Sequence, residues 1–149
     1  MKSTYLLVIF ILFATNLFAD NVIPSELVGT WHASIPEGNE HLYLRPDGLA
    51  AIFSSIGCAG IASYNSKQLI ITISLRDEHV EKAKAILIYN PKTSTIIFDK
   101  LLCYYDMHGP TGRLSEPKEE KINITFGNHE KNLPDSFRAA DIKLLQENK

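Results

Sequence analysis

The sequence has only one long apolar run, and this scarcity limits how the chain can relate to a membrane. Residues 5–14 are apolar without a break, and no second run of that length follows in the 149 residues. Such a run is far shorter than the roughly 20 residues that cross a bilayer as a helix. With Lys2 before it and the small residue Ala19 after it, it has the order of a secretory signal peptide. We therefore expect residues 1–19 to be a cleaved signal peptide and residues 20–149 to be one domain, secreted or periplasmic.

The sequence also lacks a large excess of either positive or negative charge. The chain carries 15 basic and 17 acidic residues, and removal of the signal peptide takes away one lysine and no acid, which leaves a net charge of −3. A charge so close to neutral gives no basic surface for nucleic acid or for anionic lipid. We expect a monomer that binds no nucleic acid and is not inserted in a membrane after signal cleavage.

Cysteine occurs only twice, at Cys58 and Cys103. In an exported protein, an isolated pair most simply forms one disulfide, because the compartment is oxidising and no thiol is left over. The bridge would close a loop of about 45 residues, which stabilises a fold by roughly 4 kcal/mol in the chain-entropy model. Two buried free thiols are the alternative.

Catalytic signatures are missing as well. No two histidines have the i, i+2 or i, i+4 spacing of a local metal site, and no Gly-x-Ser-x-Gly elbow frames a serine. Glycine-rich phosphate loops are absent too. We expect no enzyme activity, no metal and no cofactor. The histidines are His32, His41, His79, His108 and His129.

The feature that the sequence has in abundance is alternation of apolar and polar residues with a period of two. In residues 69–75, for example, leucine and isoleucine occupy every second position, which is typical of a half-buried strand. Turn chemistry separates such runs at residues 46–48, 65–67 and 90–94. The pattern predicts about eight strands, drawn from residues 27–34, 40–45, 49–54, 63–64, 69–75, 83–89, 95–99, 101–105 and 122–126.

Two segments depart from this alternation. Residues 107–121 hold glycine, proline and mixed charge, and they predict a long solvated loop. From Pro134 onward, apolar residues recur at helical spacing and predict one amphipathic helix that closes the chain. The helical stripe comprises Leu133, Phe137, Ala140 and Leu144.

Many short antiparallel strands in sequence order must protect their edges, either by closing into a barrel or by packing as two sheets. The meander favours an all-β, up-and-down antiparallel β-barrel with the helix against its outside or across one end. A β-sandwich built from the same strands is the alternative.

Residues 27–31 (LVGTW) then carry a resemblance to a known family. A Gly-x-Trp motif on the first strand, followed by a meander and a late helix, resembles the lipocalins and the wider calycin group. The resemblance implies that Gly29 lets the strand bend and that Trp31 plugs one barrel end beneath a basic side chain from a late strand. The last strand has no arginine, so Arg138 or Arg113 would have to substitute.

The resemblance also implies the binding of a small apolar or amphipathic ligand. An eight-stranded barrel is wide enough either to be filled by side chains or to hold one small ligand. Small residues near one end would leave room there; these are Ala50, Ala51, Ala83, Ala85 and residues 57–62. The candidate contact residues are Trp31, Phe53, Tyr64, Tyr89 and Tyr104.

A second hypothesis belongs to a different class of function. Small exported proteins without catalytic groups often act by binding another protein, as inhibitors or immunity factors do. In that case the contact would come from residues 57–63 or from the loop at residues 107–121.

Overall fold

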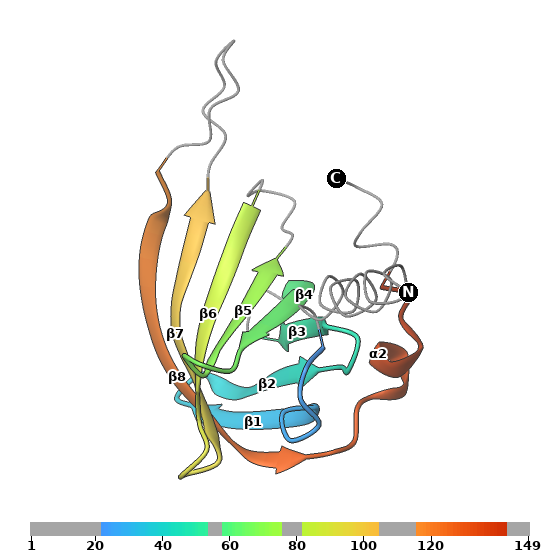
Figure 1. Cartoon of the computed structure of the whole chain (residues 1–149). Coiled ribbons are helices and arrows are strands. Elements are labelled where there is room, and N and C mark those ends of the chain that lie inside the picture. The colour runs from blue at the N-terminus through green and yellow to red at the C-terminus, as the bar shows by residue number, and fades with distance from the viewer. Residues whose placement is uncertain (1–21, 54–57, 76–81, 105–115, 143–149) are drawn as a thin grey trace, which may run out of the picture.

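Eight antiparallel strands follow one another in sequence order, and the last pairs with the first to close a barrel (Figure 1). The computed structural model describes residues 22–53, 58–75, 82–104 and 116–142, so the expected signal peptide lies outside the described residues. This closed strand order confirms the predicted barrel and excludes the sandwich. The strands are β1 (Gly29–Ile35), β2 (Gly38–Leu44), β3 (Leu49–Phe53), β4 (Cys58–Asn65), β5 (Ile70–Leu75), β6 (Lys82–Asn90), β7 (Thr95–Tyr104) and β8 (Lys118–Glu130).

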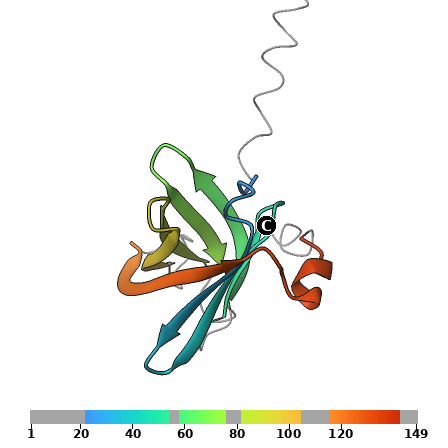
Figure 2. The ribbon, with the colours of Figure 1, turned by 90° about the horizontal axis from the view of Figure 1, so that it is seen from below.

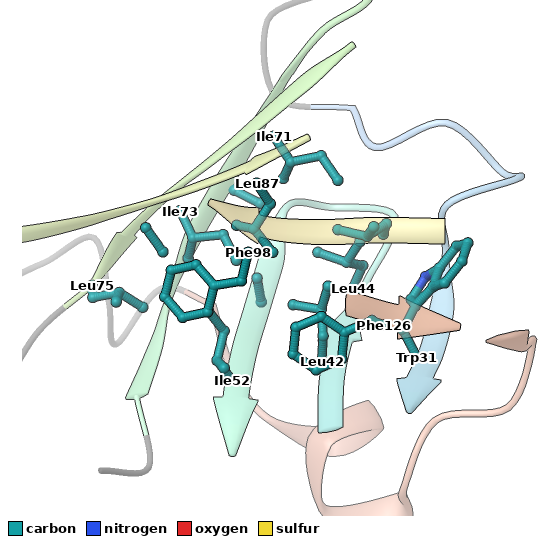
Figure 3. Packing of buried hydrophobic residues seen from close by; sticks show 14 of the residues in the cluster. Trp31, Leu42, Leu44, Ile52, Ile71, Ile73, Leu75, Leu87, Phe98 and Phe126 are labelled. Carbon is teal, nitrogen blue, oxygen red and sulfur yellow. The ribbon is translucent and has the colours of Figure 1, made fainter. Parts of the chain in front are cut away.

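The alternation along each strand places one set of side chains inside the barrel. Trp31 lies opposite Leu42 across β1 and β2, and Ile71 lies opposite Leu87 across β5 and β6. All four are fully buried in one cluster that runs through the interior. Figure 3 shows Trp31 at one end of this cluster and Leu75 at the other.

The observed strands differ most from the expected ones at β4, β7 and β8. β4 begins at Cys58, although the alanines and glycine of residues 58–62 give no strand signal of their own. β7 is one strand with an irregularity near Asp99 where two were expected. β8 begins at Lys118, so the loop expected up to residue 121 is shorter, because residues 118–121 pair with β7.

The helix α2 (Asp135–Ala139) is shorter than the predicted one. Its Phe137 packs on the outer face of β3 against Leu49 and Ala51, so Ala51 faces outward and not into the barrel. Ala140 is exposed and takes an extended backbone that ends the helix, and Leu144 lies outside the described residues. Seen from below, α2 lies outside the barrel, and the β1–β2 hairpin extends to one side (Figure 2).

Arg45 holds this short helix in place. Its Nη1 donates to the carbonyl oxygens of Phe137, at 2.9 Å, and Ala140, at 2.6 Å, while its Nε and Nη2 bind the Asp47 carboxylate at 2.8 and 2.7 Å. The hydrogen bonds from Arg45 hold the pKa of Asp47 below its ordinary value. One guanidinium therefore ties the β2–β3 turn to the end of α2.

No helix in the described ranges is both long enough and apolar enough to cross a membrane.

Candidate functional site

Trp31 closes one end of the barrel, as the Gly-x-Trp motif implies. Its ring is fully buried, and its Nε1–H donates to the carbonyl oxygen of Leu27 at 2.9 Å. Leu27 and Ile23 belong to the segment that precedes β1, and both are buried in the same cluster. The chain before the first strand thus covers the Trp31 end of the barrel.

The basic side chain over Trp31 is His129, near the end of β8. The two rings stack with centroids 4.1 Å apart and planes 11° apart. His129 Nε2 lies 2.8 Å from the carbonyl oxygen of Val28, so this nitrogen carries the proton and donates it. The expected substitute Arg138 is wrong, because it pairs with Asp135 on the exposed side of α2.

Arg113 lies outside the described residues. The sequence did not indicate His129 because the last strand was expected to end at Phe126. The basic side chain over Trp31 was expected on that strand, and His129 lies beyond its expected end.

Gly29 is required by the same arrangement. Its φ of +134° is one that side chains rarely adopt, and a Cβ atom there would lie 2.1 Å from the backbone oxygen of Glu130. β1 and β8 therefore approach so closely that only glycine fits between them.

Two further aromatic candidates lie on inner-facing positions near Trp31. The Tyr89 ring meets Trp31 edge-on with centroids 6.2 Å apart. Tyr64 packs against the core, and burial, followed by the nearby charges of Glu26 and Tyr89, raises the pKa of its phenol. Trp31 and Tyr89 are thus in contact at the covered end, and Tyr64 packs against the same core.

The other two aromatic candidates are placed differently. Tyr104 is on the outer face of β7, where Lys84 Nζ lies 5.9 Å from its ring centroid. The backbone of Phe53 pairs with His41, and its side chain lies outside the described residues. The structure therefore does not bring the five candidates into one site.

The inward-facing residues at the end opposite Trp31 are buried but keep a little accessible surface. Leu42, Leu44 and Leu87 have no exposed surface, whereas the inward-facing residues at the far end are slightly accessible. These residues are Ala33 at 5%, Leu75 at 5%, Ala83 at 6% and Cys103 at 9%. We call this end, where the inward-facing side chains keep a little accessible surface, the open end.

Glu40 is the charged residue on this inner wall. It alternates with the inward-facing Leu42 and Leu44 along β2, lies opposite Ala33 and is only 9% exposed. Among the described residues it is the one buried carboxylate, and sequence reasoning did not single it out. The sequence signal that could have identified Glu40 is an acidic residue at a position of β2 whose alternate neighbours, Leu42 and Leu44, are apolar.

The two cysteines occupy strands that are not neighbours. Cys103 is buried on the inner face of β7, and β5 and β6 lie between this strand and β4, which begins with Cys58. A disulfide requires Cα atoms within about 7 Å, and neighbouring strands are already about 4.8 Å apart. The described part of the chain contains no disulfide, and the side chain of Cys58 lies outside it. The bridge stays a prediction, which thiol titration of the denatured protein decides.

Within the described ranges, no group of three or more His, Cys, Asp or Glu side chains converges as a metal site. The fold nevertheless brings His32 and His41 together across β1 and β2, with their Nδ1 atoms 2.9 Å apart. The two histidines are nine residues apart, which is not the spacing of a local metal site. They are neighbours only because the register of the hairpin pairs them.

Comparison of the chain with protein-family models, with curated proteins and with solved structures finds no significant match in any of the three.

Proposed function

We propose that this protein is an exported binding protein, related to the lipocalin-like barrels, that takes a small amphipathic molecule into the open end of its barrel. The ligand has an apolar body and a cationic or hydrogen-bond-donating end. The observation that carries the proposal is the Glu40 carboxylate on the inner wall beside small side chains. The closed barrel and its Gly29-x-Trp31 end support the relationship to lipocalins, and the apolar run at residues 5–14 supports export.

The position of Glu40 supports this ligand class. In an apolar interior, each further cation or hydrogen-bond donor that comes near a buried carboxylate stabilises it. Ala33, directly opposite Glu40, and Ala83, on β6 toward the same end of the barrel, offer apolar surface with little bulk. A ligand with an amine at one end would place its apolar body against these walls and its charged end at Glu40.

The test compares two fluorescent probes that share one alkyl body and differ only in an amine or a carboxylate end. We expect the amine probe to bind and the carboxylate probe to bind at least 10-fold more weakly, because two carboxylates repel each other. Glu40→Gln removes the charge and should reduce the preference for the amine at least 5-fold. Glu37→Gln, at an exposed position of the β1–β2 turn, is the matched control and should change neither affinity.

Failure of both probes to bind the folded protein contradicts the proposed function. Binding of both probes with equal affinity contradicts only the role of Glu40. Native mass spectrometry of the exported protein provides the independent readout, since a co-purified lipophilic mass that is released on denaturation supports a carrier.

One observation favours the second hypothesis, a protein that acts by binding another protein. β8 has 13 residues, and its first four, Lys118 to Lys121, are exposed although they pair with β7. Figure 1 shows this part of β8 beside β7 and away from β1, which pairs with β8 only at Gly127 and Glu130. If neither probe binds and no lipophilic molecule co-purifies with the protein, this exposed part of β7 and β8 would be favoured as the functional surface.

A further inference from the structure

His32 and His41 face each other on the outer surface of the β1–β2 hairpin. They are direct partners in the strand register, with ring centroids 4.9 Å apart and ring planes at 83°. Their Nδ1 atoms are 2.9 Å apart, a distance at which one nitrogen donates and the other accepts. The His41 ring also lies parallel to Tyr43, with centroids 6.1 Å apart, so its orientation is restrained on a second side.

Glu130, at the end of β8, determines which nitrogen of His32 carries its proton. Its Oε1 lies 3.3 Å from His32 Nε2, which makes no aligned hydrogen bond within the described residues. A proton on Nε2 faces the carboxylate favourably, whereas a lone pair there would be repelled by it. The Nδ1 atom of His32 is therefore the basic nitrogen, and it accepts from the Nδ1–H of His41.

This is the arrangement by which proteins orient a metal-binding histidine. One ring nitrogen is the ligand, and the other faces a carboxylate that fixes the tautomer and increases the basicity of the ligand. Here the carboxylate is Glu130, and the nitrogen left for a ligand is His32 Nδ1. The His41 nitrogen next to it supplies the second donor.

The separation of the two nitrogens favours one coordination geometry. With metal–nitrogen bonds of about 2.0 Å, neighbouring corners of a square lie about 2.8 Å apart, and tetrahedral corners lie about 3.3 Å apart. The observed 2.9 Å agrees with the square arrangement. Square-planar or tetragonal nitrogen sites are typical of Cu(II) and Ni(II), and Cu(II) binds more tightly.

We propose that the Nδ1 atoms of His32 and His41 form a two-histidine Cu(II) site on the outside of the barrel, with Glu130 as the positioning residue for His32. Water completes the coordination. On binding, the proton of His41 moves from Nδ1 to Nε2, so two neutral imidazoles become ligands with no net release of protons. The site lies outside the barrel interior and is independent of the proposed ligand.

The experiment titrates the purified protein, without an affinity tag, with Cu(II) and follows binding by calorimetry and electron paramagnetic resonance. We expect one Cu(II) per chain and superhyperfine splitting from two nitrogens. His32→Ala and His41→Ala should each weaken binding at least 10-fold. Glu130→Gln should weaken it about 10- to 100-fold, as loss of such a carboxylate does elsewhere, and Glu130→Asp should recover part of the loss.

The matched control is the double variant His79→Ala/His108→Ala, which removes two other histidines and should bind Cu(II) as the native chain does. Circular dichroism verifies that each variant is folded, and His41→Gln is a second, milder replacement. Unchanged affinity in both His41 variants, or loss of binding in the control variant, overturns the proposal. Absence of binding to the folded native chain at 100-fold excess of Cu(II) overturns it too.

Discussion

At the scale of single residues, Gly29 has the least freedom to change. A Cβ atom at this position would lie 2.1 Å from the Glu130 oxygen and 2.8 Å from His129 Nε2, and the φ of +134° is strained for any side chain. We expect Gly29→Ala to lower the free energy of unfolding by more than about 3 kcal/mol, since both the backbone torsion and the contact between β1 and β8 must change. Urea unfolding followed by the fluorescence of Trp31 measures the loss.

Gly127→Ala is the matched control for this prediction. Gly127 is also in the contact between β8 and β1, yet a Cβ atom there meets nothing within 4 Å. Its replacement should change stability by less than about 1 kcal/mol. Equal losses in the two variants would show that the close approach at Gly29 is not what limits the position.

The residue scale also shows what a sequence pattern conveys and what it does not. Trp31 is identifiable because its motif is local. His129 is not, because Phe126 and His129 both contact the core although they are three residues apart, which breaks the period of two. The cause is an irregular register between β8 and β1 and the positive φ of 43° at Asn128. Such an irregularity depends on the partner strand and leaves no mark in the strand's own alternation.

At the scale of elements, α2 depends on Arg45. A helix of five residues is too short to be stable alone, so its position must come from tertiary contacts. These contacts are Phe137 on β3 and the Arg45 hydrogen bonds to the last carbonyl groups. Removing the guanidinium takes a donor from those carbonyl groups and leaves the Asp47 carboxylate with the weaker hydrogen bond from the Leu49 N–H, at 3.3 Å.

We therefore expect Arg45→Met, which keeps much of the apolar stem, to release the C-terminal segment without unfolding the barrel. Trypsin cleavage after Arg138 should become at least 10-fold faster, while the fluorescence of Trp31 stays unchanged. Lys92→Met, at an exposed turn position, is the control and should leave cleavage after Arg138 as it is. An unchanged cleavage rate in Arg45→Met would mean that Phe137 alone holds the helix.

The strands were easier to predict than the helix because their signal repeats along the chain. Residues 69–75 and 83–89 alternate clearly, and the observed β5 and β6 agree with them to within one residue at each end. β4 was largely missed, since alanine and glycine have no strong strand preference. Gly60 is required in β4, because β5 approaches so closely that a Cβ atom at this position would lie 2.0 Å from the backbone oxygen of Ser74.

At the scale of the whole molecule, the barrel interior has two unequal halves. Leu42, Leu44 and Leu87 have no accessible surface, whereas the smaller side chains toward the open end, Ala33, Ala83 and Cys103, are 5%, 6% and 9% exposed. The sequence contains both kinds of residue but cannot state their grouping, because the grouping arises from the register of eight strands.

Two alanines on the same face of β6 allow a direct test of this asymmetry. Ala85 lies opposite Ile73 with no exposed surface, whereas Ala83, two residues nearer the open end, lies opposite Leu75 with 6% exposed. We expect Ala85→Leu to reduce the free energy of unfolding by about 1 to 3 kcal/mol, because added methylenes force a filled core to shift. Ala83→Leu should cost less than about 0.5 kcal/mol and should weaken binding of the amine probe at least 5-fold, since the same added volume enters the space that the ligand needs. Equal destabilisation by the two variants in urea would mean that the interior is filled from end to end, which would move the function from the interior to the outer surface.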